Sequence, residues 1–145
     1  MFRRITQADR EEFLVMSREF YASDAVISNI PEEYHQKTFD ELMRSDIYLV
    51  CYIFEVDGNT AGYALLNRCF NHEAGGEVIW IEELYVRSPY RSRGVGGNFL
   101  EWIAANTDAS RLRLETEPDN LRAKALYKKH GFDSLSYESM YRDIK

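Results

Sequence analysis

The segment Arg91-Ser92-Arg93-Gly94-Val95-Gly96-Gly97 has the composition of an anion-binding loop. It follows an apolar segment expected to be a strand and opens an amphipathic helix, whose first turn carries free backbone N–H groups and a partial positive charge. Gly94 and Gly96 let the backbone approach a phosphate without a Cβ in the way, and Arg91 and Arg93 add charged donors. On spacing alone, a strand-to-helix turn that needs flexible glycines is an equal alternative.

Two other kinds of phosphate loop fit this segment poorly. Nucleoside-triphosphate loops continue with Gly-Lys-Ser/Thr, which is missing here. Dinucleotide folds place G-x-G-x-x-G after an early strand, whereas this loop comes late and follows an antiparallel region. Both classes of nucleotide site are therefore disfavoured.

Hydrophobic periodicity predicts the elements that must position the loop. The expected strands span residues 2–5, 48–56, 61–68, 77–86 and 111–116, with a last strand or hairpin over 135–143. The expected helices start at Thr6 and near Pro31, run from Gly94 to about residue 106, and run from the cap Asn120 to Gly131. This order predicts a single α/β (α+β) domain over residues 1–145, with a mixed, mainly antiparallel sheet flanked by helices.

The composition sets limits on location and partners. The 145 residues are 45% hydrophobic and 29% charged with a net charge of −6, as in ordinary globular proteins. The acidic balance argues against nucleic acid and slightly favours a cationic substrate. No apolar run is long enough for a membrane span and no signal peptide is visible, so we expect a cytoplasmic protein without a membrane partner. Cys51 and Cys69 lack metal-ligand spacing and are expected to be reduced packing residues, with no metal bound.

Two separate blocks of the sequence together resemble the GCN5-related N-acetyltransferase (GNAT) family. The first reads I-E-E-L-Y-V over residues 81–86 and continues with P-Y-R-S-R-G-V-G from Pro89. The second reads L-E-T-E-P-D-N from Leu114 and A-K-A-L-Y-K-K-H-G-F over residues 123–132. The blocks stand in the family's order and separation, and the resemblance is specific over residues 78–132. It implies acetyl-CoA as the co-substrate and a primary amine as the acceptor.

The resemblance also implies where acetyl-CoA binds. The backbone of Leu84 and Val86 should hydrogen-bond the pantetheine arm where two strands splay apart, and the N–H groups of residues 92–97 should hold the pyrophosphate. Asn120 should bind the pantetheine or position its helix, and Tyr127 should lie near the thioester sulfur. The co-substrate contacts expected in all are Leu84, Tyr85, Val86, Arg91, Ser92, Arg93, Gly94, Val95, Gly96, Gly97, Asn120 and Ala123.

Attack of an amine on a thioester needs a base, a polarised carbonyl and an acid for the leaving thiolate. A lysine-like amine has a pKa near 10.4, so its deprotonation at neutral pH costs roughly 4 kcal/mol. A carboxylate, acting through water, is expected to take that proton. Tyr127 is expected to protonate the thiolate, and the backbone N–H of Leu84 or Tyr85 to polarise the carbonyl.

Glu82 is the expected base. By strand alternation it shares a face with Leu84 and Val86, while Glu83 points the other way. A bulge, which the family often has in this strand, would exchange the two glutamates. The similar diamine acetyltransferases carry a glutamate at this position near the amine. A solvated or salt-bridged surface role for Glu82 is the alternative.

The expected acceptor is a small cationic molecule such as a polyamine, an amino acid or an aminoglycoside. In the family the substrate wall comes from the first two helices and their loop, here residues 21–41. Five acidic residues in that stretch suit a cation, or form a solvated helix face: Asp24, Glu32, Glu33, Asp40 and Glu41. The alternatives are acetylation of a peptide N-terminus or lysine, and a non-catalytic CoA-binding module. Similar proteins are commonly homodimers, but no segment of this sequence identifies a dimer interface.

Overall fold

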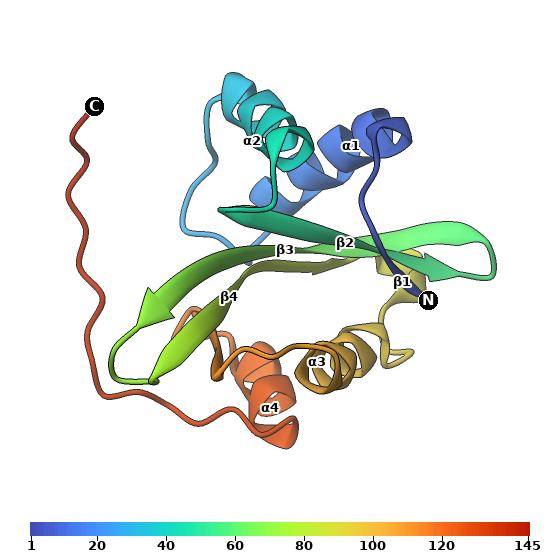
Figure 1. Ribbon diagram of the computed structural model, residues 1–145. Helices are drawn as coiled ribbons and strands as arrows, with labels where there is room; N and C mark the ends of the chain where they lie inside the picture. The colour runs from blue at the N-terminus through green and yellow to red at the C-terminus, as the bar shows by residue number, and fades with distance from the viewer.

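A computed structural model describes residues 1–145 as a five-stranded sheet with two helices on each face (Figure 1). The strands are β1 (Phe2–Arg4), β2 (Leu49–Val56), β3 (Asn59–Asn71), β4 (Gly76–Val86) and β5 (Arg111–Leu114). The helices are α1 (Arg10–Tyr21), α2 (Glu32–Arg44), α3 (Val95–Ala105) and α4 (Leu121–Lys129), with short 3-10 turns at Gln7–Asp9 and Ser88–Tyr90. The strands follow one another in sequence order, and all neighbours are antiparallel except β4 and β5. The predicted α+β class with a mixed, mainly antiparallel sheet is confirmed.

The sheet separates two hydrophobic cores. Helices α1 and α2 cover one face and α3 and α4 the other (Figure 1). On the first face, Phe13 and Phe20 of α1 pack near Tyr63 of β3, because residues seven apart lie on one side of a helix. On the second face, Phe99 of α3 packs against Phe54 of β2. Burying a phenylalanine of this kind stabilises the fold by about 1.5–3 kcal/mol.

A β-bulge in β4 decides which residues face each core. Glu83 pairs with Leu65 and Ile81 pairs with Leu66, so Glu82 is an extra residue without a partner on β3. Ile81 packs in the core beneath α3, and after the bulge Leu84 packs there too. In a regular strand, residues on one face are two positions apart. Ile81 and Leu84 are three apart, because the bulge inserts one extra residue between them.

The sheet opens between the carboxyl ends of its two parallel strands. Pairing between β4 and β5 runs only from Val78 with Arg111 to Ile81 with Leu114. Residues 82–86 of β4 therefore have no neighbouring strand on that side. The Val86 carbonyl accepts from Arg91 Nε, and the other backbone groups that face this side are free to bind another extended chain. The chain leaves β5 for α4, which lies on the same face of the sheet as α3 (Figure 1).

The prediction of a last strand or hairpin over residues 135–143 is wrong. This segment runs extended past the turn between β3 and β4 without pairing to any strand (Figure 1). Its apolar side chains Tyr137, Met140 and Tyr141 are exposed, and the Tyr137 hydroxyl donates to Glu73 across 2.9 Å. An alternating pattern becomes a strand only where a neighbouring strand accepts its hydrogen bonds.

Two further features of the chain bear on the predictions. Cys51 is buried in the core under α1, whereas Cys69 is exposed on β3, so the prediction that both are packing residues is wrong for Cys69. No helix combines the length and apolar character needed to cross a bilayer.

Candidate active site

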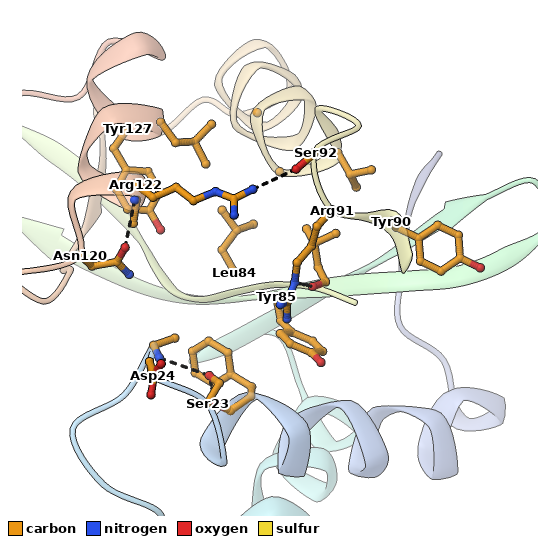
Figure 2. A pocket seen from close by; sticks show the side chains of 18 of the residues that line it. Ser23, Asp24, Leu84, Tyr85, Tyr90, Arg91, Ser92, Asn120, Arg122 and Tyr127 are labelled. Atoms are coloured by element: carbon orange, nitrogen blue, oxygen red, sulfur yellow. Dashed lines mark hydrogen bonds between the residues drawn. The ribbon is translucent and has the colours of Figure 1, made fainter. Parts of the chain in front are cut away.

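A large cavity lies at the opening of the sheet. It has a volume of about 730 Å³ and is enclosed by β4, the chain after α1, the loop before α3, and α4 (Figure 2). All the predicted co-substrate contacts except Arg93 line it: Leu84, Tyr85, Val86, Arg91, Ser92, Gly94, Val95, Gly96, Gly97, Asn120 and Ala123. Tyr127 lines it as well. Two segments about 30 residues apart in sequence thus form one site.

The glycine-rich loop takes the shape that a helix N-terminus needs to meet an anion. Gly94 is the N-cap of α3 and has a left-handed φ of 78°, which glycine adopts without strain. A Cβ at Gly96 would lie 3.8 Å from Leu84, inside the cavity lining. Gly97 has another reason to be glycine, because a Cβ there would come within 2.5 Å of the His130 ring. Gly97 therefore also allows α3 to pack closely on the end of α4.

The arginines around the loop are arranged differently from the prediction. Arg91 donates from Nε to the carbonyl oxygen of Val86 across 2.8 Å and lines the cavity. Arg93 lies outside the cavity lining, with its guanidinium 5.6 Å from the centre of the Tyr90 ring. An arginine that the sequence analysis missed, Arg122, lines the cavity from α4. The sequence feature that could have identified Arg122 is its position in the first turn of the helix capped by Asn120, which was itself a predicted contact.

Helix α4 presents Asn120, Ala123 and Tyr127 to the cavity. Asn120 Oδ1 accepts the Ala123 backbone N–H across 3.1 Å, so the predicted helix cap is confirmed (Figure 2). The three residues recur at spacings of three and four and share one helix face. Burial raises the pKa of Tyr127 above its ordinary value, so its phenol is protonated at neutral pH.

A second, smaller cavity of about 290 Å³ lies between the sheet and helices α1 and α2. The residues that line it are Ser17, Tyr21, Ile30, Tyr34, His35, Thr38, Leu49, Leu65, Asn67, Glu82 and Glu83. The prediction that Glu83 points away from Leu84 and Val86 is confirmed, but the prediction that Glu82 shares their face is wrong. The bulge directs both carboxylates into the smaller cavity, while Leu84 and Val86 line the larger one.

The two carboxylates of the smaller cavity have different surroundings. Glu83 is only 5% exposed, and its two oxygens accept from the hydroxyls of Tyr63 at 2.6 Å and Tyr21 at 2.8 Å. Burial raises the pKa of Glu83 to about 7, against the opposing effect of these hydrogen bonds. Glu82 is more exposed, and its Oε2 accepts from the Asn67 side chain at 2.9 Å. Partial desolvation raises the pKa of Glu82, again opposed by its hydrogen bond.

The remaining polar groups of this cavity are neutral. His35 is buried, its Nδ1 lies 2.6 Å from the Ser17 hydroxyl, and burial lowers the pKa of its imidazole. No lysine or arginine lines the cavity, so its charge comes from the two glutamates alone. This is an environment for a cation.

Residues 21–41 contribute five side chains to the smaller cavity, but none of the five acidic residues of that stretch lines it. Glu32 and Glu41 pair with Arg18 and Arg44 on the surface. Glu33 and Asp40 are exposed and line neither cavity, and Asp24 lines the larger one. The cavity charge instead comes from β4. Asn67, a polar side chain next to an apolar strand segment, was the sequence feature that could have indicated this polar cavity.

Comparison with known proteins identifies the family. The model of the Acetyltransferase (GNAT) family matches residues 10–132. The chain belongs to this family. It is thus an acyl-CoA-dependent acetyltransferase, and the resemblance seen in the two sequence blocks is confirmed.

Relatives across the GNAT family share both sequence and fold with the chain. An uncharacterized N-acetyltransferase from Lactobacillus delbrueckii subsp. lactis is 28% identical over 145 residues, covering 92% of this chain and 84% of that one. The structure of a possible acetyltransferase from Clostridium difficile 630 superposes with a TM-score of 0.86 at 16% identity, covering 100% and 97% of the two chains. An aminoglycoside N-acetyltransferase in complex with CoA superposes with a TM-score of 0.78 at 18% identity, covering 100% and 95%. At these identities the two structures show a shared fold.

Proposed function

We propose that this acetyltransferase passes an acetyl group from acetyl-CoA directly to a small cationic primary amine. The observation that supports this most is the position of the two cavities. They meet at β4, where consecutive residues line them, Glu83 the smaller and Leu84 the larger. An amine in one and a thioester in the other would approach each other at this strand, which makes the reaction effectively intramolecular.

The larger cavity fits acetyl-CoA, which supplies the activated acyl group. Free N–H groups at the start of α3 suit the pyrophosphate, and residues 82–86 of β4 have a free edge for the pantetheine amides. Arg91 carries no carboxylate partner, and its charge is free to act on phosphate. A backbone N–H of Leu84 or Tyr85 would polarise the carbonyl.

Glu82 is the proposed base of the reaction. Its Oε1 has no hydrogen-bond partner in the protein and it opens to the smaller cavity, whereas both oxygens of Glu83 already accept from tyrosines. A raised pKa also brings Glu82 closer to the working pH, where general bases are most effective. Tyr127, protonated and on the wall of the larger cavity, is the proposed acid for the leaving thiolate.

The smaller cavity indicates the size and charge of the acceptor. A volume of about 290 Å³ is at the lower limit of typical small-molecule sites, so it suits a slim amine better than a molecule of several rings. The similar aminoglycoside N-acetyltransferase supports an amine acceptor in general. We therefore propose a polyamine or a basic amino acid, ahead of an aminoglycoside or a peptide.

Thiol release from acetyl-CoA tests the proposal. The panel contains polyamines, amino acids, aminoglycosides and short peptides, and Tyr127→Phe is assayed beside the parent. Tyr137→Phe is the matched control, because Tyr137 is exposed and lines neither cavity. We expect turnover with one class of amine and a loss of about 10²- to 10⁴-fold in kcat for Tyr127→Phe only. Tight CoA binding without turnover on any amine would instead favour a non-catalytic CoA-binding module.

A further inference from the structure

Arg122 reaches across the mouth of the larger cavity. Its Nη2 donates to the Ser92 hydroxyl at 3.0 Å, joining the first turn of α4 to the loop before α3 (Figure 2). An arginine has five N–H donors, and no other hydrogen bond engages those of Arg122. Most of its guanidinium is therefore free to bind another group in the cavity.

Arg122 has no carboxylate partner, in contrast to most arginines of the chain. Those at positions 3, 4, 10, 18, 44, 68, 87 and 111 each lie within ion-pair distance of an aspartate or glutamate. In a protein of net charge −6, an arginine directed at a cavity without such a partner leaves local positive charge at that mouth. A polyanionic ligand is attracted there although the molecule as a whole is acidic.

Ser92, the partner of Arg122, has a special backbone conformation. Its φ is 62°, in the left-handed region that residues other than glycine rarely adopt. Conformations of this kind persist where the surroundings fix them, and they are frequent at ligand-binding loops. The hydrogen bond from Arg122 is one contact that holds Ser92 in this position.

We infer that Arg122 binds the pyrophosphate of the co-substrate from the side opposite the α3 amides. Together with Ser92, it closes the loop over the pyrophosphate. The inference rests on the proposed use of acetyl-CoA. The pyrophosphate is favoured over the 3′-phosphate because Ser92 belongs to the glycine-rich loop itself, so a guanidinium bonded to Ser92 lies at the cradle. The fork of an arginine binds two phosphate oxygens at once, which a lysine cannot do.

Calorimetric titration with CoA and with dephospho-CoA, which lacks only the 3′-phosphate, tests this role without catalysis. We expect Arg122→Gln to raise Kd about tenfold for both ligands, the size of one lost charge-assisted hydrogen bond. The Kd of Arg122→Lys should lie between those of the parent and Arg122→Gln. Ser92→Ala should raise Kd for both ligands by less than Arg122→Gln does. Lys128→Gln is the matched control, an exposed cation on the same helix outside the cavity, and should leave Kd unchanged.

A second measurement separates phosphate binding from a general effect on the fold. The kcat/KM of Arg122→Gln should fall with acetyl-CoA and stay at the parent value with S-acetyl-pantetheine, which has no phosphate. An equal fall with both donors would overturn the inference, as would a loss of affinity for CoA that is absent with dephospho-CoA. If the parent binds neither CoA nor dephospho-CoA, the proposed function itself fails. If the parent binds both ligands and Arg122→Gln binds them with equal affinity, only the role of Arg122 is refuted.

Discussion

Glu83 and Leu84 are consecutive in β4, yet Glu83 lines the smaller cavity and Leu84 lines the larger one. Phe20 and Tyr21 at the end of α1 are divided in the same way, Phe20 lining the larger cavity and Tyr21 the smaller one. The backbone of β4 beside Leu84 is free on the side of β5, because the parallel pairing stops at Ile81 and Leu114. We therefore expect an acyl group held beside Leu84 to be within reach of an amine held beside Glu83.

Glu82→Gln should lower kcat/KM for the acceptor by about 10²- to 10⁴-fold at neutral pH, since the base is removed at nearly constant shape. In the parent, activity should rise as the pH increases through the raised pKa of Glu82, because a base acts in its ionised form. The variant should lack this acidic limb. Steady-state kinetics from pH 5 to 9 would show it, with the exposed Glu33→Gln as control. An unchanged profile in Glu82→Gln would contradict the assignment.

Glu83→Gln should change how stability depends on pH. The folded-state pKa of about 7 lies above the ordinary 4.5, so ionisation of Glu83 opposes folding. The parent should lose up to about 3 kcal/mol of stability from this group as the pH rises from 4.5 through 7, with no such loss below 4.5. Urea unfolding at pH 5 and pH 8 measures this loss, which should be absent in the variant. Equal pH dependence of both proteins would show that Glu83 is not perturbed.

Ionisation of Tyr127 should not lower kcat between neutral pH and pH 10. An acid acts in its protonated form, and burial raises the pKa of this phenol, so its ionisation begins later than in free tyrosine. The pH profile of kcat in the parent, measured with a saturating amine, should therefore stay level between neutrality and pH 10. A decline near pH 8 that disappears in Tyr127→Phe would contradict this.

Gly97→Ala and Gly96→Ala should affect different properties. A Cβ at Gly97 meets the His130 ring at 2.5 Å, and Glu101 holds that ring by a 2.7 Å hydrogen bond, so we expect a loss of about 1–3 kcal/mol of stability. The double variant with His130→Ala should recover part of that loss. At Gly96 the nearest atom is 3.8 Å away, so stability should hold while CoA affinity falls. Thermal unfolding and CoA titration of the variants would distinguish these effects, and equal stability of both single variants would contradict the packing role of Gly97.

Local features of the site could be predicted from the sequence. Glycines before an amphipathic helix, Asn120 as a cap and the apolar period of β4 act over a few residues, so residue type and spacing determine them. The same signals, in two blocks, were enough to indicate the family. The resemblance to that family implied that Tyr127 lies near the thioester, and Tyr127 does line the larger cavity.

Contacts between distant segments could be known only from the tertiary structure. The bulge at Glu82 depends on the register against β3. Strand alternation assigns only Glu83 to the smaller cavity, and the extra residue of the bulge brings Glu82 there as well. Arg122 meets Ser92 from 30 residues away, and Arg93 lies outside the cavity although its spacing matches that of Arg91. The final segment has the pattern of a strand but no neighbour to pair with. Periodicity describes one chain segment at a time, whereas register and side-chain contact are properties of two.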